Sequence, residues 1–317
     1  MISRRHRFAA TLALALAAAP ALGQNSAYPT RPIQVVIAWT PGGIVDSIGR
    51  TFAGVFSQTL GQPATVVNRV GAAGTIGALA VASAAPDGYT LGFGPLTPIT
   101  NAPHLMKSVT YRADSFDYIC QVFENGFGIV VSQDSPLKNL SDLIAYLKAN
   151  PGAAYGHLGI GVLSHLYVEN IAHNQGLTAT GTPYKGEAEM LPDVMTGRLS
   201  FGVVSVAGMR GKSVRLLGVF LDRRHPAFPD VPTVSEAGLP TLSAPRNGWF
   251  APKGLPPETL RKLRAACESG MNSNEIQSAF NRVNQPTAYL SGPDLAAKTV
   301  SEFDQAGRLI RSLKLSE

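Results

Sequence analysis

The stretch that decides the fold is IQVVIAWTPGGIVDSIGRTFAGVFSQTLG, residues 33–61. Its first part, 33–39, is apolar at nearly every position, as expected of a β-strand that helices cover on both faces. Apolar residues then recur at helical spacing, at Val45, Ile48, Phe52, Val55 and Phe56. Gly61 can adopt the left-handed conformation that ends a helix. The stretch therefore predicts a central strand, a tight turn and an amphipathic helix.

The same alternation continues over the first third of the chain. A second strand is predicted at 64–68, a glycine-rich turn and helix at 71–85, and a third strand at 89–94. Strand, helix and strand in this order are typical of parallel β-α-β units.

A change of pattern near residue 120 predicts a second lobe. Two strand-like runs, 116–123 and 127–133, follow each other closely. Ser141 is then expected to cap a helix that Pro151-Gly152 ends. Further strands and helices alternate up to residue 220, so the second lobe repeats the α/β architecture.

The end of the chain has a different pattern. A proline-rich stretch at 225–240 is followed by helical segments up to 293–314, and we expect this tail to return to the first lobe. The predicted fold class is α/β with two lobes, each a mixed sheet flanked by helices. The predicted boundaries are 24–122 and 245–317 for lobe 1, and 123–244 for lobe 2.

Residues 1–23 are predicted to be a signal peptide. Three arginines precede an uncharged Ala/Leu-rich run at 8–19, and Ala21-Leu22-Gly23 offers the small residues that a signal peptidase requires. The prediction is cleavage after Gly23 and a periplasmic protein. The alternative is an N-terminal membrane anchor. Two observations argue against it: the run is too short to span a bilayer, and no stop-transfer pattern follows.

Charge and composition restrict the classes of partner. The three leader arginines belong to 27 Lys and Arg residues, which leaves 24 against 21 Asp and Glu. Without the leader the excess of basic residues is small, so the charge no longer favours a nucleic-acid partner. Only Cys120 and Cys267 are present, which excludes four-cysteine metal sites. We expect two buried thiols, with one disulfide as the alternative, and no metal or cofactor.

The turn after the first predicted strand is a candidate anion site. Pro41, Gly42 and Gly43 lie between a strand and a helix N-terminus, where free N–H groups and the helix dipole favour negative charge. Asp46 is expected to cap this helix, with direct ligand contact as the alternative. A Walker sequence and a complete dinucleotide fingerprint are missing, so a small organic anion is the remaining ligand class.

A second glycine-rich loop, GHLGIGVLSH at 156–165, has the same place in the second lobe. Two such loops, facing each other, would hold one carboxylate from both sides. His157 is a candidate ligand contact or general base, whereas His165 is expected to be buried and hydrogen-bonded. Neither G-x-S-x-G nor H-E-x-x-H occurs, which favours a binding protein over an enzyme. The enzymatic alternative is a secreted hydrolase or isomerase with His157 as base beside Asp46.

The sequence resembles the substrate-binding proteins of tripartite tricarboxylate transporters, the Bug or TctC-like family. The similarity extends over nearly all of the mature chain. It is carried by YPTRPIQVVIAWTPGGIVDSIGR, VVNRVGAAGTIGALAVASAAPDGYTL, TPYKGEAEMLPDVMTGRLSF, RRHPAFPDVPTVSEAGLP and WFAPKGLPPETLRKL.

The resemblance implies a type II-like Venus flytrap that captures a dicarboxylate, aromatic acid or amino acid and presents it to membrane transporter subunits. A receptor that serves a signalling partner is the other reading, and a monomer is expected. The implied ligand-binding residues are Thr40, Pro41, Gly42, Gly43, Ile44, Asp46, Gly74, Thr97, His157, Gly159, Gly161, Val162, His165 and Ser205.

Several positions depart from the family pattern. His157 and Val162 stand where the family has serines in the second loop, and Ser200 replaces an acidic residue. Arg246 stands where the family often has an aromatic residue. The His and the apolar side chain suggest a ligand with an apolar or aromatic part.

Overall fold

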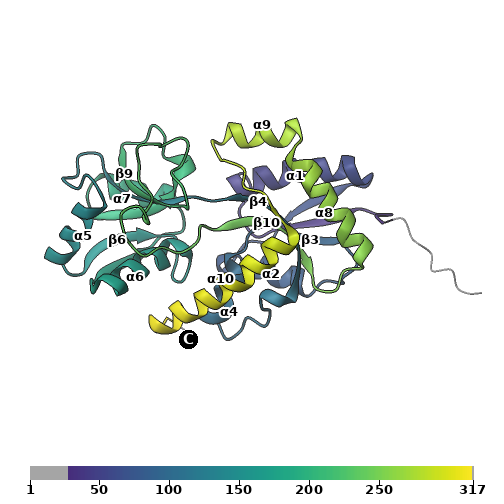
Figure 1. Ribbon diagram of the computed structural model, residues 1–317, viewed down its shortest axis with the longest axis horizontal. Coiled ribbons are helices and arrows are strands. Elements are labelled where there is room, and N and C mark those ends of the chain that lie inside the picture. Colours follow the sequence, from purple (N-terminus) through teal and green to yellow (C-terminus); the bar gives the residue numbers. More distant parts are fainter. Residues whose placement is uncertain (1–27, 316–317) are drawn as a thin grey trace, which may run out of the picture.

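The computed structural model describes residues 28–315 and contains two mixed β-sheets with helices around each (Figure 1). The first sheet has the strand order β11-β4-β10-β3-β1-β2, and the second has the order β7-β6-β8-β5-β9. We call the part built on the first sheet lobe 1 and the part built on the second sheet lobe 2. The predicted signal peptide lies outside the described residues.

Lobe 1 begins with the predicted parallel units. Strand β1 pairs in parallel with β2 on one side and with β3 on the other, so it is central to its half of the sheet. Gly61 ends the first helix with φ 74°. The elements are β1 (Ile33–Ile37), α1 (Ile44–Leu60), β2 (Ala64–Asn68), η1 (Ala72–Gly74), α2 (Thr75–Ala82), β3 (Thr90–Pro95), α3 (Thr97–Thr100), α4 (Ala102–Leu105), η2 (Ala113–Ser115) and β4 (Phe116–Glu124).

Lobe 2 starts directly after β4. The two closely spaced strands of the sequence belong to different sheets, with only Asn125 and Gly126 between them. Strand β5 pairs antiparallel with β8 and β9, whereas β6 is parallel to both β7 and β8. The elements are β5 (Phe127–Ser132), α5 (Leu140–Ala149), β6 (Ala153–His157), α6 (Leu163–Gln175), β7 (Ala179–Pro183), α7 (Glu187–Met195), β8 (Phe201–Ser205), η3 (Val206–Gly208) and β9 (Val214–Phe220).

One helix start differs from the prediction. The side chain of Asn139, not of Ser141, caps α5 by accepting a hydrogen bond from the Asp142 amide at 2.9 Å. Both residue types are good caps, and periodicity places a helix start only to within a few residues.

The chain returns to lobe 1 through strand β10, which lies between β3 and β4 and is antiparallel to both. The remaining elements are β10 (Arg246–Pro252), α8 (Pro257–Met271), α9 (Asn274–Arg282), β11 (Leu290–Ser291) and α10 (Gly292–Ser312). Helix α10 packs on β4 and α3, so the end of the chain lies against lobe 1 (Figure 1). The Asn125 amide donates to Pro245 O at 2.9 Å, so the two chain crossings between the lobes are hydrogen-bonded to each other.

An aromatic cluster holds α1 on the sheet of lobe 1. Phe52 and Phe56 on α1 and Trp249 on β10 are each 0% exposed, and the rings of Phe56 and Trp249 are 4.6 Å apart. Truncating such a phenylalanine to alanine costs about 3–5 kcal/mol. The cluster therefore holds α1 against the sheet.

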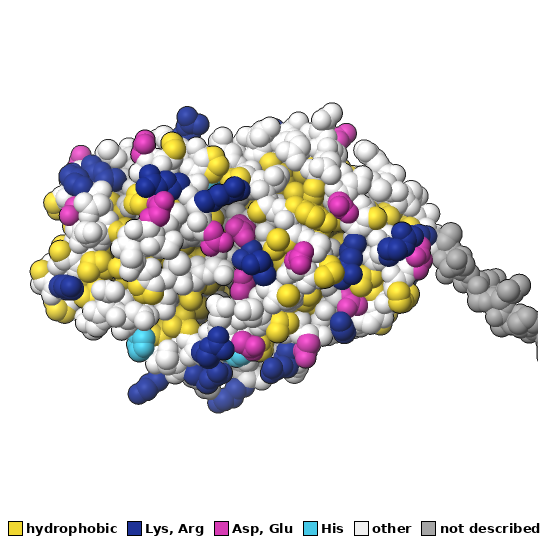
Figure 2. All heavy atoms as spheres, in the orientation of Figure 1, with side chains coloured by type: hydrophobic (Ala, Val, Ile, Leu, Met, Phe, Trp, Pro, Cys, Tyr) yellow, Lys and Arg dark blue, Asp and Glu magenta, His cyan; other side chains and the backbone are white. Residues whose placement is uncertain are grey.

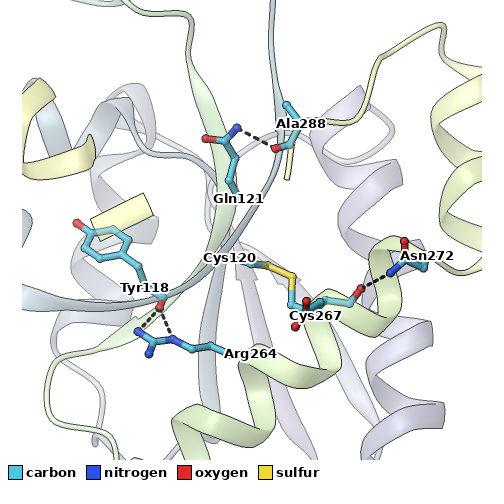
Figure 3. Close-up of a disulfide and its surroundings, with 8 residues drawn as sticks. Tyr118, Cys120, Gln121, Arg264, Cys267, Asn272 and Ala288 are labelled. Carbon is cyan, nitrogen blue, oxygen red and sulfur yellow. Dashed lines mark hydrogen bonds between the residues drawn. A yellow bond between two sulfur atoms is a disulfide. The ribbon is translucent and has the colours of Figure 1, made fainter. Parts of the chain in front are cut away.

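The expectation of two buried thiols is wrong. Cys120 on β4 and Cys267 on α8 form a disulfide, with their Cα atoms 6.5 Å apart (Figure 3). Arg264, one turn before Cys267, donates to Tyr118 O at 3.0 Å and also joins α8 to β4. The cysteines are 147 residues apart, so only the packing of α8 against β4 brings them together.

Candidate ligand-binding site

The first candidate loop, Thr40 to Gly43, joins β1 to α1 and is exposed. Gly43 is the N-cap residue and makes no side-chain cap bond. Within the described chain, the amides of Gly43, Ile44 and Val45 carry no hydrogen bond. Free amides at the positive end of a helix dipole favour an anion.

The side chain of Asp46 stabilises this loop through hydrogen bonds. Its carboxylate accepts from the Gly42 amide at 2.9 Å, from Arg50 Nε at 2.9 Å and from Asn68 Nδ2 at 2.8 Å. Burial alone would raise the pKa of Asp46, but the bonds from Arg50, Asn68 and Gly42 outweigh it and hold that pKa below its usual value. The carboxylate is 3% exposed and has its partners inside the protein, which supports the capping role over ligand contact.

Gly74 lets an aromatic side chain support the same loop. Its φ is +91°, and a Cβ there would lie 2.6 Å from the ring of Trp39 and 2.7 Å from Pro98. Only glycine combines this backbone conformation with such close packing. Gly74 therefore positions Trp39, which directly precedes Thr40.

The second candidate loop, Leu158 to Val162, joins β6 to α6, and several of its amides already have partners. The Leu158 amide donates to Ser164 Oγ at 3.0 Å. The Gly161 amide donates to His165 Nδ1 at 3.2 Å. His157 Nδ1 lies 3.1 Å from Gly159 N and 2.8 Å from Gly159 O, so either tautomer ties this ring to the loop.

Both histidines lie beneath the loop, with His157 1% and His165 7% exposed. Burial, and then the charge of His165, lowers the pKa of His157 to about 4. Burial also lowers the pKa of His165. Both rings are therefore neutral at pH 7 and act as internal braces, the arrangement that the sequence favoured for His165.

The start of α6 leaves backbone amides open in lobe 2. Val162 is the N-cap residue without a side-chain cap bond, and the amides of Leu163 and Ser164 make no hydrogen bond within the described chain. Helix α6 of lobe 2 thus begins in the same way as α1 of lobe 1. The amides that could bind an anion at this loop are therefore those at the start of α6, and not those of Gly159 and Gly161.

The edge of lobe 2 that carries this loop faces lobe 1. Asn101 Nδ2 donates to Gly161 O at 3.3 Å, and Leu105 on α4 packs directly on Gly161. Gly161 has φ +75°, which also favours glycine. Strands β6, β7 and β8 are parallel, so the loops that follow all three lie at this edge.

Thr97 lies in a narrow crevice between the lobes. Leu96 and Thr97 line it from lobe 1, and Leu163 and Ser243 from the other side. Its volume of about 40 Å³ has room for only a few water molecules. An organic acid therefore requires the lobes to separate along this face.

Arg246, a departure from the family pattern, belongs to a buried ion cluster that the sequence did not reveal. Its guanidinium donates to Glu302 at 2.7 Å and to Gln121 at 3.1 Å, and also contacts Glu124. Arg246 is 6% exposed. Burial raises the pKa of Glu302, and Arg246 opposes this shift. The cluster ties the start of β10 to α10 and to the end of β4.

Ser205, at the end of β8, lies beside the first chain crossing. Its hydroxyl donates to Asn125 Oδ1 at 3.0 Å, and its amide donates to Glu187 Oε1. Glu187 is the first residue of α7 and was not predicted, because a lone glutamate in a helix has no distinctive pattern.

The surface chemistry is mixed. Figure 2 shows acidic and basic side chains interspersed over one face of the molecule. Among residues 28–315, no group of three His, Cys, Asp or Glu side chains could hold a metal ion. None of the helices in this range has the length and apolar character to cross a bilayer.

Comparison with known proteins identifies the family. The model described as "Tripartite tricarboxylate transporter family receptor" matches residues 48–315. The "UPF0065 protein in gbd 5'region" of Cupriavidus necator is 34% identical over 325 residues, covering 100% of this chain and 98% of that protein. The chain belongs to the tripartite tricarboxylate transporter receptor family.

Solved structures agree with this assignment. A TctC solute-binding protein from Polaromonas has a TM-score of 0.79 at 27% identity, covering 90% of this chain and 99% of its own. MatC from Rhodopseudomonas palustris with bound malate has a TM-score of 0.75 at 26% identity, covering 89% and 100%. Rpa4515 from R. palustris with adipate has a TM-score of 0.77 at 26% identity, covering 90% and 98%.

These comparisons confirm the two-lobed α/β periplasmic binding protein fold. The protein is a TctC-family solute-binding receptor, and this family is one of periplasmic receptors and not of enzymes.

Proposed function

We propose that this TctC-family receptor closes over one small organic carboxylate and delivers it to the membrane subunits of a tripartite tricarboxylate-type transporter. Closure would bring the start of α1 and the start of α6 to the same ligand. The ligand would favour the closed state because only there does it contact both lobes. Malate and adipate in the related R. palustris structures support a carboxylate ligand.

The observation that carries the proposal is the pair of uncapped helix starts. Gly43 and Val162 are N-cap residues without side-chain cap bonds, and each begins a helix with free amides at the edge of its lobe. Charge-assisted hydrogen bonds from such amides are stronger than neutral ones. The two sites are alike in chemistry although they share no sequence motif.

Within this proposal the predicted residues divide into two groups. Thr40, Pro41, Gly43, Ile44 and Val162 would meet the ligand, with Thr97 and Ser205 nearer the crossings between the lobes. The others position the loops, because their polar groups already have partners or their side-chain space is filled: Gly42, Asp46, Gly74, His157, Gly159, Gly161 and His165.

The proposal also includes features of the whole chain. These are a signal peptide at 1–23 with export to the periplasm, lobes bounded at 24–122 with 245–317 and at 123–244, and a monomeric receptor without cofactor or metal. It has no catalytic step, since no nucleophile or general base is needed to bind a carboxylate.

The test is a thermal-shift screen of the mature protein with malate, adipate, succinate, benzoate and aspartate, and with glucose and a neutral dipeptide as controls. A ligand at 100 times its Kd stabilises the native state by about 2.7 kcal/mol, so an organic acid should raise the melting temperature. Stabilisation by glucose or the dipeptide, and by no acid, would contradict the proposal. Mass spectrometry after incubation should recover the acid unchanged; turnover would favour the enzymatic alternative.

A further inference from the structure

Glu187 lies at the edge of lobe 2 that faces lobe 1. Strand β7 ends at Pro183, and α7 begins at Glu187 after a short turn. The parallel strands β6 and β8 end at His157 and Ser205 on the same edge. Glu187 therefore shares this edge with the candidate loop before α6.

The contacts of Glu187 place it close to the chain crossing. Its Oε1 accepts a hydrogen bond from the Ser205 amide, and the Ser205 hydroxyl donates to Asn125. Asn125 is the first residue between β4 and β5, in the first crossing from lobe 1 to lobe 2. The carboxylate is thus near the base of the region between the lobes.

Among the described residues, this half-buried carboxylate has no cationic partner. Glu187 takes part in none of the ion pairs among residues 28–315. Its Oε2 makes no hydrogen bond in this part of the chain. The fully buried side-chain atoms without a partner are Asn247 Oδ1 and Trp249 Nε1, so Glu187 Oε2 retains contact with solvent. Burial raises the pKa of Glu187, and the Ser205 amide opposes this shift.

The Ser205 amide and the positive end of the α7 dipole stabilise this carboxylate, but a negative charge beside an anion site still requires a chemical explanation. A desolvated negative charge is costly unless a positive charge or further hydrogen bonds stabilise it. It would also repel a ligand that carries only carboxylates. A ligand that carries an ammonium group as well as a carboxylate removes both difficulties.

We propose that Glu187 selects, among organic carboxylates, those that also carry an ammonium group. The ligand carboxylate would lie against the amides at the starts of α1 and α6, and its ammonium group would donate to Glu187 Oε2. The inference rests on the proposed function, because it concerns the ligand of the same site.

A purely structural role for Glu187 is the competing explanation, since it accepts from the Ser205 amide. Glu187→Gln separates the two roles. Glutamine keeps an oxygen that can accept from Ser205 and removes the negative charge. Glu189→Gln is the matched control, because Glu189 is exposed two residues further along the same helix.

The experiment is isothermal titration calorimetry with ligand pairs that differ only in the ammonium group. The pairs are aspartate and succinate, glutamate and glutarate, and phenylalanine and 3-phenylpropionate. The wild type should bind the amino member of at least one pair at least tenfold more tightly. Glu187→Gln should lose at least tenfold in affinity for that amino acid and change less than threefold for its partner, and Glu189→Gln should change neither.

Three outcomes would overturn the inference. The first is a wild type that binds the acids without preferring the amino member, a result that does not depend on any variant and leaves the proposed function intact. The second is a Glu187→Gln variant that weakens both members of the pair equally, or neither. The third is that no acid binds, with or without an ammonium group, in which case the proposed function fails as well.

Discussion

The Gly42 amide donates a hydrogen bond to the Asp46 carboxylate at 2.9 Å, across the first turn of α1. Of the two glycines in the turn, Gly42 is thus used to hold the loop, and Gly43 leaves its amide open. The same division occurs in lobe 2, where histidines and Ser164 occupy loop amides and the start of α6 remains uncapped. Preorganised loops and open helix starts together are what an anion receptor requires.

Asp46→Ala should reduce both stability and affinity. The substitution leaves the Gly42 amide, Arg50 and Asn68 without their acceptor, which costs about 1–3 kcal/mol in the free energy of unfolding. A freed loop should also weaken binding of the organic acid at least tenfold. Urea unfolding and calorimetry measure the two effects. Glu258→Ala removes an exposed carboxylate from α8 as the control, and an equally small effect of Asp46→Ala would show that the brace is unimportant.

Loss of the disulfide should lower stability and leave binding intact. The disulfide joins β4 to α8 in lobe 1 and closes a long loop, for which roughly 2–5 kcal/mol of stabilisation is typical. Reducing agent should lower the melting temperature of the wild type, whereas Cys120→Ala/Cys267→Ala should melt at the lower temperature with or without it. Two free thiols in the denatured, unreduced protein would contradict the pairing.

How much the sequence predicts depends on how local each feature is. The unit β1-α1 was predictable because apolar periodicity, the Gly42-Gly43 turn and the Gly61 stop all lie within 29 residues. The disulfide was mispredicted because it depends on packing between segments 147 residues apart. The cap of α5 was misplaced by two residues because Asn139 and Ser141 are both good caps.

In the candidate site, too, local features were predictable and long-range contacts were not. Its two helix starts were predictable, but the internal partners of Gly42, Gly159 and Gly161 were not, because a hydrogen bond depends on side-chain orientation. Arg246 departs from the family pattern, but its partners Glu124 and Glu302 lie 122 and 56 residues away. Such long-range polar contacts have no periodic signal.

Arg246→Ala should destabilise the protein more than the loss of an exposed arginine. It would leave Glu302 and Glu124 without their cation in a mostly buried site, and removing one partner of a buried ion pair costs about 3–5 kcal/mol. The measurement is the free energy of unfolding in urea. Arg261→Ala, which breaks an exposed pair on α8, should have little effect. Equal effects of the two substitutions would show that the buried cluster contributes no more than a surface pair.

Stability should fall as the pH is lowered from about 6.5 to about 4, partly through His157. Its pKa is about 4 in the folded protein and near 6.5 when unfolded, so in this range the unfolded state binds the extra proton. The contribution is present above pH 6.5, is lost as the pH falls, and amounts to at most roughly 3 kcal/mol at 1.36 kcal/mol per pKa unit. The His157→Gln variant should therefore show a weaker pH dependence in urea unfolding. Parallel curves for the two proteins would contradict this assignment.

The most direct measurement is the affinity of the best-binding organic acid for Gly43→Val and for Gly54→Val. Gly43 has φ −73°, and a Cβ there would have Thr40 O at 3.7 Å as its nearest neighbour, so valine fits the fold but covers the open amides. Gly54 is exposed on the same helix with nothing within 4 Å, so its substitution controls for the helix. If the starts of α1 and α6 hold the carboxylate, Gly43→Val should lose at least 100-fold in affinity at an unchanged melting temperature, and Gly54→Val should bind like the wild type. Wild-type affinity in a folded Gly43→Val protein would contradict it.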